Sequence, residues 1–421
     1  MNIIVIGSGG REHTVIKKLA QSPEITKIYA LPGNGGIAAD AECVNIGATD
    51  IDGIVDFAKD HDIGYAVVTP DDPLALGAVD RLNEIGIPCF GPTAAAAQIE
   101  ASKVFSKNLM KKYGIPTAAF EVFENAEDAL RYVKTAPLPT VIKADGLALG
   151  KGVIIAETRE DAVSAVKSIM EDGVFGKSGN RIVVEEFLTG PEVSVLAFTD
   201  GTTVKPMVSS MDHKRAHDGD EGLNTGGMGT VAPNPYYTAD IADVCMNTIF
   251  LPTIKAMKEE GREFRGCLYF GLMLTPNGPK VIEYNCRFGD PETQVVLPLL
   301  ESDLFTVMKA TTNGTLAETE VKFSDGAACC VVLASNGYPE KYEKGYEITI
   351  PEGIDGEVYV AGAKLEGGKL LTNGGRVLGA VATADDLKTA VKKAYAVADR
   401  IEFGNKYCRR DIGARALKAI K

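Results

Sequence analysis

The sequence predicts a multidomain protein of α/β and α+β architecture. The chain has 421 residues, more than a single hydrophobic core usually accommodates, so we expect two to four packed units. Its 45 glycines exceed average usage, and many follow short apolar runs, as in the ligand-binding turns of α/β domains. Beyond residue 325 the pattern changes to short strands with one closing helix, which is typical of a small α+β domain.

The composition disfavours several classes of partner. A formal net charge of -13 argues against general binding to a DNA or RNA backbone, which requires clustered Lys and Arg. No apolar stretch reaches membrane-spanning length, and the N-terminus lacks the basic region of a signal peptide. The eight cysteines include no Cys-x-x-Cys pair, which favours free thiols in a reducing compartment. We therefore expect a soluble, cytoplasmic protein without nucleic-acid or membrane partners.

The first hundred residues alternate strands and helices. Residues 2–6 are a continuous apolar run, as in a buried parallel strand, and the glycine loop at 7–10 leads into a predicted helix at 11–20. Bare amides in such a loop can bind an anion. A dinucleotide site is disfavoured, because Glu12 replaces the third glycine of the motif and the second strand, 27–30, ends without an acid. A phosphate site is the better interpretation.

The next segments lead to a glycine-rich loop. Further α/β elements are predicted at 65–69, 73–85 and 88–90, and the first unit ends near residue 100. A basic helix is predicted at 101–113, and Gly-Ile-Pro at 114–116 terminates it. The strand 140–142 ends at Lys143, before a loop of small residues up to Gly152. Such a loop can close over phosphates while the ammonium neutralises their charge, although a simple hairpin turn fits the same residues.

The most informative stretch begins at the strand 280–284. Side chains of a strand repeat every two residues, so Glu283 and Asn285 should face the same side. Two oxygen ligands on one face are typical of a Mg²⁺ site that phosphates and waters complete. Arg287 follows at the next same-face position, where its guanidinium can grip a carboxylate or phosphoryl group, and Asp290 lies in the turn beyond. Taken alone, the Glu-x-Asn pattern also fits an exposed strand edge.

Two further segments have the features of ligand-binding loops or linkers. Residues 181–185 form a strand that enters a short linker, whose backbone can hold an adenine ring. Residues 211–229 are a long polar stretch with many glycines, so we expect an ordered functional loop. His213 and His217 should not form a helical zinc pair there, because the zincin motif requires Glu at the position of Lys214.

The remaining chain predicts one helix, a strand pair and the C-terminal unit. A helix is expected at 239–261 with Pro252 as an interruption, and paired strands at 266–275 and 280–284 flank a Pro-Asn-Gly-Pro turn. The closing helix is expected at 385–400. The predicted C-terminal strands are 328–334, 346–350, 357–361, 369–371 and 377–382.

Six motifs carry a resemblance that covers essentially the whole chain. They are Gly-Ser-Gly-Gly-Arg-Glu-His at 7–13, Lys-Ala-Asp-Gly-Leu-Ala-Leu-Gly-Lys-Gly-Val at 143–153, Asp-His-Lys-Arg at 212–215, Asn-Thr-Gly-Gly-Met-Gly at 224–229, Arg-Phe-Gly-Asp-Pro-Glu-Thr-Gln at 287–294 and Arg-Arg-Asp-Ile-Gly at 409–413. Together they resemble glycinamide ribonucleotide synthetase, also called phosphoribosylamine-glycine ligase, a family of ATP-grasp enzymes of purine biosynthesis. The length and number of these motifs make the resemblance specific.

The resemblance implies an architecture and a reaction. It implies a Rossmann-like N-terminal domain at 1–102, an ATP-grasp domain at 103–325 with a mobile lid at about 117–188, and a C-terminal α+β domain at 326–421. It also implies ATP-dependent ligation of glycine to 5-phosphoribosylamine through glycyl phosphate, giving glycinamide ribonucleotide, ADP and phosphate. Mg²⁺ or Mn²⁺ would assist, the partners would be small-molecule substrates, and the protein would be a monomer.

The resemblance also implies the site residues. The ATP site would comprise Lys103, Lys143, Gly150, Gly152, Glu185, Glu186, Phe187, Leu188 and Glu192. Substrate-binding residues would be Gly9, Gly10, Arg11, Gly33, Asn34, Lys214, Arg215, Gly226, Gly227 and Arg287. The implied catalytic residues are Arg287, Lys143, Asp290 and Asp212, with Asp290 orienting the amine, and the implied metal ligands are Glu283 and Asn285.

Two departures and two alternatives accompany the resemblance. Residues 359–363 read Tyr-Val-Ala-Gly-Ala where the family usually has Phe-His-Ala-Gly-Thr, and 271–274 lack the carboxylate that many ATP-grasp enzymes place on that strand. A different ATP-grasp ligase or carboxylase would turn over ATP without glycine. A nucleotide sensor that has lost catalysis would bind ATP without turnover, but the intact Lys143, Glu283 and Arg287 argue against it.

Overall fold

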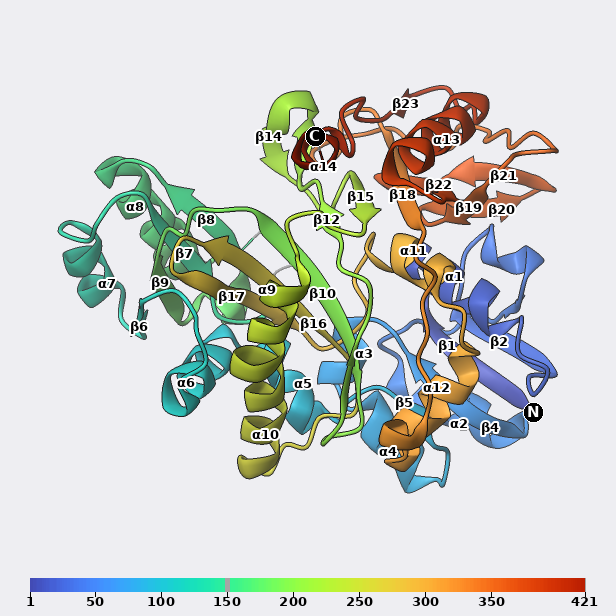
Figure 1. Cartoon of the computed structure of the whole chain (residues 1–421), viewed down its shortest axis with the longest axis horizontal. Coiled ribbons are helices and arrows are strands. Elements are labelled where there is room, and N and C mark those ends of the chain that lie inside the picture. The colour runs from blue at the N-terminus through green and yellow to red at the C-terminus, as the bar shows by residue number, and fades with distance from the viewer. Residues whose placement is uncertain (148–151, 421) are drawn as a thin grey trace.

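A computed structural model of the chain (Figure 1) describes residues 1–147 and 152–420. The expected α/β and α+β architecture is confirmed, with four main sheets, two of which interleave along the chain. The predicted lid loop falls partly on 148–151, so Gly150 lies outside the described residues. Among the described residues, no helix is long and apolar enough to cross a membrane.

The N-terminal unit is a five-stranded parallel sheet in the order β3-β2-β1-β4-β5. Its strands are β1 (Asn2–Gly7), β2 (Lys27–Pro32), β3 (Glu42–Cys43), β4 (Ile63–Val68) and β5 (Cys89–Phe90). Its helices are α1 (Gly10–Leu19), α2 (Ile51–Asp60), α3 (Asp71–Ala75), α4 (Ala78–Glu84) and α5 (Ala94–Ala101). The single helix expected at 73–85 is wrong, because Gly77 adopts a left-handed φ of 85° and separates α3 from α4.

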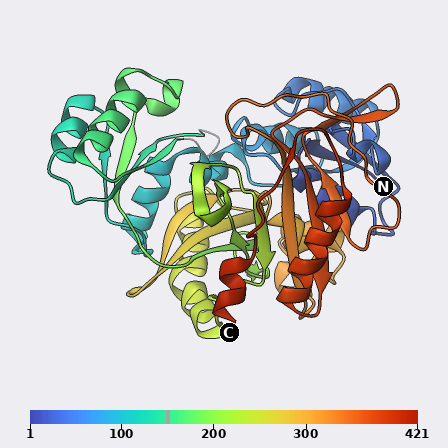
Figure 2. The same ribbon diagram turned by 90° about the horizontal axis from the view of Figure 1, so that it is seen from above.

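The second unit is a small antiparallel sheet in the order β6-β9-β7-β8, which projects at one end of the molecule (Figure 2). Helix α6 (Lys103–Tyr113) leads into it. Its elements are β6 (Phe120–Phe123), α7 (Ala126–Val133), β7 (Thr140–Ala144), β8 (Val153–Ala156), α8 (Arg159–Val166) and β9 (Ile182–Glu186). Its apolar side chains form a hydrophobic cluster of their own, whereas the N-terminal and central sheets share clusters. We refer to this unit as the lid sheet, because it lies within the segment at about 117–188 where the family resemblance implies a lid.

The central unit is an antiparallel sheet in the order β11-β10-β16-β17. Its strands are β10 (Glu192–Thr199), β11 (Val204–Pro206), β16 (Gly266–Thr275) and β17 (Gly278–Asn285). The helix expected at 239–261 forms as α9 (Ala239–Cys245), a π turn (Met246–Phe250) and α10 (Leu251–Glu259). Pro252 lies in the first turn of α10, directly after the π turn, so the helical segment continues past the proline. Helices α11 (Thr293–Val296) and α12 (Leu304–Asn313) follow the sheet.

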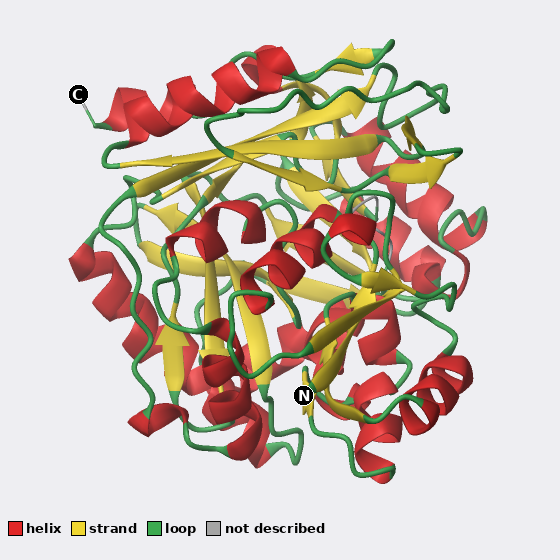
Figure 3. Cartoon of the chain, turned by 90° about the vertical axis from the view of Figure 1, so that its right-hand side faces the viewer, coloured by secondary structure: helices red, strands yellow, loops and turns green. Residues whose placement is uncertain are grey.

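The last sheet combines distant parts of the chain. Its order is β12-β15-β18-β22-β19, and β23 pairs with β18. Its strands are β12 (Met211–Asp212), β15 (Gly229–Ala232), β18 (Ala327–Ser335), β19 (Glu357–Val360), β22 (Arg376–Ala384) and β23 (Lys406–Tyr407). Helix α13 (Leu387–Arg400) covers one face of this sheet (Figure 3), and α14 (Ala414–Ala419) follows. Segments on both sides of residue 325 therefore build one sheet.

Two expectations in this region are wrong. Residues 346–350 form no continuous strand: Glu347 bridges to Leu371 of the hairpin β20 (Ala363–Glu366) and β21 (Lys369–Thr372), whereas Thr349 bridges to Glu402. Their alternating pattern is divided between two partners, so no ladder forms. Residues 211–229 are not an unbroken loop either. They contain a hairpin of β13 (Arg215–His217) and β14 (Glu221–Asn224), with Gly219 at a φ of 74° in the turn.

The turn between β9 and β10 yields a stability prediction. Gly190 has a φ of 146°, and a Cβ there would lie 2.1 Å from the carbonyl oxygen of Leu274. We expect Gly190→Ala to lower the free energy of unfolding by about 2–4 kcal/mol, since a side chain would clash with fixed backbone. Gly278→Ala is the matched control, because Gly278 has a φ of 103° and no atom near the added methyl.

Urea unfolding of both variants checks this prediction. The control should lose only about 1 kcal/mol from backbone strain. Equal losses in the two variants would contradict the close approach of the turn to β16.

Candidate active site

A cavity of about 460 Å³ lies where the lid sheet, the N-terminal unit, the central sheet and the C-terminal sheet meet. Twelve residues singled out from the sequence are among the described residues that line it: Arg11, Lys103, Lys143, Gly152, Glu185, Asp212, Lys214, Gly226, Glu283, Asn285, Arg287 and Asp290. Residues from all parts of the chain therefore converge on one space, although the longest separation among them exceeds half the sequence.

Strand β17 presents the two oxygen ligands as the period of a strand predicts. Asn285 pairs with Tyr269 and Glu283 with Gly271 across the β16–β17 ladder, and both side chains line the cavity. Gly271 makes room for Glu283, because a Cβ at Gly271 would lie 3.1 Å from Cγ of that glutamate. The register of the β16–β17 ladder shifts between Gly271, which pairs with Glu283, and Leu272, which pairs with Val281. The regular alternation along β17 is therefore interrupted just before Glu283.

Cations surround the Glu283 carboxylate. Lys214 Nζ lies 3.7 Å from Glu283 Oε1. Burial alone would raise the pKa of Glu283, but Lys214, Lys143, Lys103 and Arg287 outweigh it and hold the pKa below its usual value. The carboxylate is therefore ionised at neutral pH, with four cationic side chains around it.

Glu185 joins two buried lysines. Its carboxylate ion-pairs with Lys143 Nζ at 3.1 Å and with Lys107 Nζ at 3.0 Å, and all three side chains are at least 95% buried. Burial lowers the pKa of Lys107 to about 8, and Glu185 partly offsets that effect. Lys143 Nζ also donates to the carbonyl of Ile282. Taken alone, neighbouring glutamates such as Glu185 and Glu186 are usually a solvated acidic pair, but Glu185 is instead the buried, shared counter-ion of two lysines.

Lys103 lies at the entrance of the glycine-rich loop. Its Nζ donates to the carbonyl of Gly146 at 2.8 Å, and burial lowers its pKa. Asp145 anchors the same loop, because its carboxylate accepts hydrogen bonds from Ser102 Oγ and the amide of Val104, and also from the side chain of Arg181. The start of α6 and the loop are thus held together.

Three arginines order the turn after β17. Arg287 Nη2 donates to Glu100 Oε1 at 3.0 Å, and the Glu100 carboxylate also accepts the amide of Cys286 at 2.7 Å. Arg376 donates to the carbonyl of Asp290, and Arg11 donates to that of Phe288. These bonds link the N-terminal unit and the C-terminal sheet to the central sheet.

Two acidic groups face different surroundings. Burial would raise the pKa of Asp290, but Arg376 and Arg11 outweigh it and lower it, so Asp290 is ionised. Burial and Glu292 raise the pKa of Asp212 well above its usual value. Lys214 and Arg376 act in the opposite direction on Asp212 but do not outweigh these effects. The two neighbouring carboxyl groups offer acceptors to a bound ammonium group.

The glycine loop of the N-terminal unit differs from the expected bare anion site. The amide of Gly9 already donates to the Glu12 carboxylate, and Arg11 Nε donates to the same carboxylate at 2.6 Å. The expectation of a free amide is therefore wrong for Gly9. Asn34 donates to the carbonyls of Ser8 and Val360 at 2.8 Å each. The bond to Val360 involves only the backbone carbonyl of that residue. It can therefore form with valine at position 360, although the family usually has histidine there.

Several predicted residues do not line the cavity. Those among the described residues are Gly9, Gly10, Gly33, Asn34, Glu186, Phe187, Leu188, Glu192, Arg215 and Gly227. Gly227 is nonetheless adjacent, since a Cβ there would lie 2.7 Å from Asp212 Oδ1. Arg215 instead donates to Gly222 within the hairpin. Its contact with a substrate is not supported in this conformation.

Sequence reasoning missed several groups at the cavity. Lys107 lies four residues after Lys103 in a predicted helix, so helical spacing places both on one face and could have revealed it. Glu100 is the one charged residue of the alanine-rich α5, a further available signal. Tyr269 and Arg376 carry no such local signal, because only the tertiary fold brings them to the cavity.

The arrangement of sheets and the cavity define an ATP-grasp protein. The phosphoribosylglycinamide synthetase family models match as the N domain over residues 1–100, the ATP-grasp (A) domain over 101–293 and the C domain over 328–415. The chain belongs to the phosphoribosylglycinamide synthetase family. It catalyses the ATP-dependent ligation of glycine to phosphoribosylamine, which forms glycinamide ribonucleotide in purine biosynthesis.

Relatives support this assignment over the full length. The phosphoribosylamine-glycine ligase of Halalkalibacterium halodurans is 47% identical over 419 residues, covering 99% of this chain and 97% of that protein. The ligase of Vibrio cholerae is 47% identical, covering 99% of each chain. The crystal structure of the Thermotoga maritima ligase matches with a TM-score of 0.87 and 36% identity, over 98% of this chain and 100% of that chain.

A more distant structure shows the fold alone. Biotin carboxylase from Campylobacter jejuni matches with a TM-score of 0.76 at 15% identity, over 97% of this chain and 92% of that chain. Residues 101–293 match an ATP-grasp domain, and ATP-grasp enzymes use ATP with a divalent metal ion.

The ion-pair geometry yields a second stability prediction. Glu185→Gln removes the counter-ion that two buried lysines share, so we expect a loss of about 3 kcal/mol in the free energy of unfolding at pH 7. Glu186→Gln is the matched control, because Glu186 is 41% exposed and pairs with Lys280 at the surface.

Urea unfolding of the two variants measures this difference. The control should lose less than about 0.5 kcal/mol, as exposed ion pairs do. A Glu185→Gln protein as stable as the wild type would contradict the counter-ion role.

Proposed function

We propose that the ligation proceeds through glycyl phosphate in the cavity between the lid and the central sheet. The observation that carries this proposal is the convergence of Lys103, Lys143 and Arg287 with Glu283 and Asn285 on that cavity. A carboxylate is a poor electrophile because resonance stabilises it. Phosphorylation of one carboxylate oxygen makes that oxygen part of a phosphate leaving group. Cations placed around the transferring phosphoryl group stabilise its charge.

Glu283 and Asn285 would hold a divalent ion. The donor set fits this role: a carboxylate and an amide oxygen share one face of β17, and both are hard oxygen ligands. Among the described residues, no group of three or more acidic, histidine or cysteine side chains could hold an ion, so phosphates and waters complete the shell. The ion, Mg²⁺ or Mn²⁺, would neutralise phosphate charge when bound.

The nucleotide would lie between the lid sheet and β17. Lys143 and Lys103 are within the cavity and can neutralise phosphates, while the linker at 185–188 can hold the adenine through its backbone. Glu192, at the exposed start of β10, would contact the ribose. The distant biotin carboxylase was solved as a complex with β-γ-ATP, which supports a nucleotide site in this fold.

Lys143 would change partners when ATP binds. It contacts Glu185 and the carbonyl of Ile282. A phosphate carries more charge than either and would compete for the ammonium. Glu185 then remains paired with Lys107, so the charge of the pocket stays balanced.

Glycine and phosphoribosylamine would occupy the opposite side of the cavity. The acidic pair Asp212 and Glu292 can receive the glycine ammonium, and Lys214 can attract its carboxylate. Arg11, with the Gly9–Gly10 loop and the segment at 33–34, would receive the phosphoribosyl group. The Gly9 amide donates to the Glu12 carboxylate. Either this amide would donate to the substrate phosphate instead, or Arg11 alone would contact the phosphate.

The two chemical steps follow from this placement. A carboxylate oxygen of glycine attacks the γ-phosphorus of ATP, the bond to ADP breaks, and glycyl phosphate forms. The amine of phosphoribosylamine then attacks the carbonyl carbon, the carbon–oxygen bond to phosphate breaks, and the amine loses a proton. Asp290, held ionised by Arg376 and Arg11, would orient that amine.

The compartment and assembly remain proposals as well. All eight cysteines are free thiols, and six are buried, which supports a reducing, cytoplasmic environment. We propose a monomer, since one chain supplies all the residues placed around the cavity.

Substrate dependence tests the proposed reaction. We expect purified protein with Mg²⁺ and ATP to release ADP at an appreciable rate only when glycine and freshly generated 5-phosphoribosylamine are both present. Coupled detection of ADP and chromatographic detection of glycinamide ribonucleotide measure the outcome. ADP release that ignores glycine would exclude the proposed substrates.

The metal ligands give a sharper test. Glu283→Gln keeps the shape of the side chain but removes its charge, so we expect kcat/KM to fall about 100-fold or more and the Mg²⁺ requirement to rise. The free energy of unfolding should change by less than about 2 kcal/mol. Activity and Mg²⁺ dependence like those of the wild type would remove Glu283 from the metal site.

A further inference from the structure

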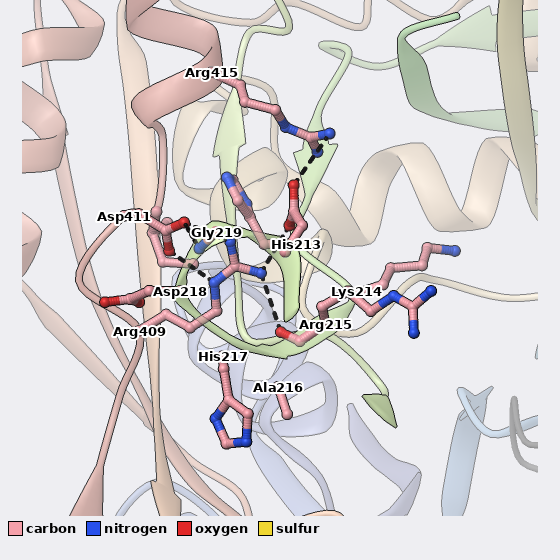
Figure 4. Close-up of polar contacts among 12 residues, drawn as sticks. His213, Lys214, Arg215, Ala216, His217, Asp218, Gly219, Arg409, Asp411 and Arg415 are labelled. Carbon is pink, nitrogen blue, oxygen red and sulfur yellow. Dashed lines mark hydrogen bonds and ion pairs between the residues drawn. The ribbon is translucent and has the colours of Figure 1, made fainter. Parts of the chain in front are cut away.

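The motif at 409–413 forms a clamp on the β13–β14 hairpin (Figure 4). Arg409 is fully buried, at 1% exposure, and four of its hydrogen bonds reach only two carboxylates and one carbonyl. Two bonds of 2.8 Å go to the carboxylate of Asp411, and bonds of 3.0 Å go to Asp220 Oδ1 and the carbonyl of Arg215. The guanidinium therefore links the C-terminal segment to strand β13 and to the turn of the hairpin.

Asp411 completes this clamp from the other side. Its Oδ2 also accepts the amide of Gly219, at 2.9 Å, in the turn of the hairpin. Burial would raise the pKa of Asp411, but the hydrogen bond from Arg409 and the amide of Gly219 outweigh it and hold the pKa well below its usual range. Asp411 is thus ionised, and one carboxylate fixes both Arg409 and the turn.

Neighbouring residues extend the contact along the hairpin. Tyr407 donates from its hydroxyl to the carbonyl of Ala216 at 3.0 Å. The amide of Gly413 donates to His213 Nε2, and His213 Nδ1 donates to the carbonyl of Gly229. Burial lowers the pKa of His213 to about 4, so its imidazole is neutral and can serve both partners at pH 7.

Hydrophobic packing contributes little to the position of the hairpin. Ala216 is its single buried residue between 214 and 224, and every residue of β14 is exposed, with Leu223 at 53%. Polar bonds to the C-terminal segment must therefore determine where the hairpin lies. The position of the hairpin therefore depends on the planar guanidinium of Arg409, whose several donors a lysine could not replace.

Both ends of the hairpin enter the cavity. Lys214 precedes β13 and lines the cavity, as do Thr225 and Gly226 after β14. The amide and hydroxyl of Thr225 both donate to the carbonyl of Lys214, so the two ends move together. Arg376 and Tyr338 hold Gly226 from the C-terminal sheet through its carbonyl and amide.

We propose that Arg409 is a positioning residue that, through Asp411 and the β13–β14 hairpin, sets Lys214 and Gly226 for glycine binding. This inference rests on the proposed glycine site and goes beyond it, because Arg409 itself does not line the cavity. The C-terminal segment thereby determines substrate affinity from outside the site.

Three variants test the clamp. Arg409→Lys keeps the charge but cannot form the fork, and Asp220→Asn removes one charged acceptor at the less buried end of the clamp. Arg410→Lys is the matched control: its side chain is 55% exposed and pairs with Asp399, and only its backbone amide contacts the hairpin, at Asp218. The readouts are KM and kcat for each substrate and hydrogen exchange of the 213–226 amides.

We expect Arg409→Lys to raise the KM for glycine about tenfold, because small misplacements of binding groups weaken substrate positioning strongly. KM for ATP and kcat should change less than about twofold, and exchange should accelerate in 213–226 while β18 stays protected. Asp220→Asn should show the same pattern about threefold more weakly, since the fork to Asp411 survives. The control should match the wild type.

Two results would overturn the proposal. One is an unchanged KM for glycine in Arg409→Lys and Asp220→Asn despite folded protein. The other is an equal loss across all substrates with exchange raised throughout the chain, which indicates a merely structural role. Lys214→Gln distinguishes a wrong glycine site from a wrong clamp. If this variant has an unchanged KM for glycine, the assignment of Lys214 to the glycine site is wrong. If the clamp variants nevertheless accelerate exchange in 213–226, the clamp has only a structural role.

Discussion

Buried charge is the constraint on which the rest of this structure depends. The cavity removes carboxylates and cations from water, so each must be neutralised by a specific partner. Glu185 neutralises Lys107 and Lys143, and Glu100 holds Arg287. Lys143 and Glu185 lie on adjacent strands of the lid sheet and Lys107 joins them from α6, whereas Glu100 links α5 of the N-terminal unit to the turn after β17. A nucleotide with its metal ion can replace some of the pairs, which explains how a folded cavity can be ready for a highly charged substrate.

Different parts of the chain contribute different contacts to the cavity. The central sheet and the lid supply the charged groups, whereas the last hundred residues supply the contacts that hold the substrate hairpin. The hairpin has almost no apolar surface to bury, so the buried Arg409 and its partly exposed carboxylate partners take the place of a hydrophobic core.

The sequence predicted local geometry better than distant pairing. The two-residue period of β17 placed Glu283 and Asn285 on one face, and the α/β rhythm of the first hundred residues was read correctly. The hairpin in 211–229 was missed, because its glycines indicated a loop and its position depends on Arg409, almost two hundred residues away. The counter-ion role of Glu185 was missed for the same reason: nothing in its local sequence names its lysine partners.

The most direct measurement of the central claim follows an isotope from glycine into phosphate. Turnover of glycine labelled with ¹⁸O in both carboxylate oxygens should transfer one label to inorganic phosphate and leave the other in the amide of the product, as glycyl phosphate requires. Mass spectrometry of phosphate and glycinamide ribonucleotide gives the answer. Phosphate free of label after full turnover would contradict phosphorylation of the carboxylate and the roles proposed for the cavity.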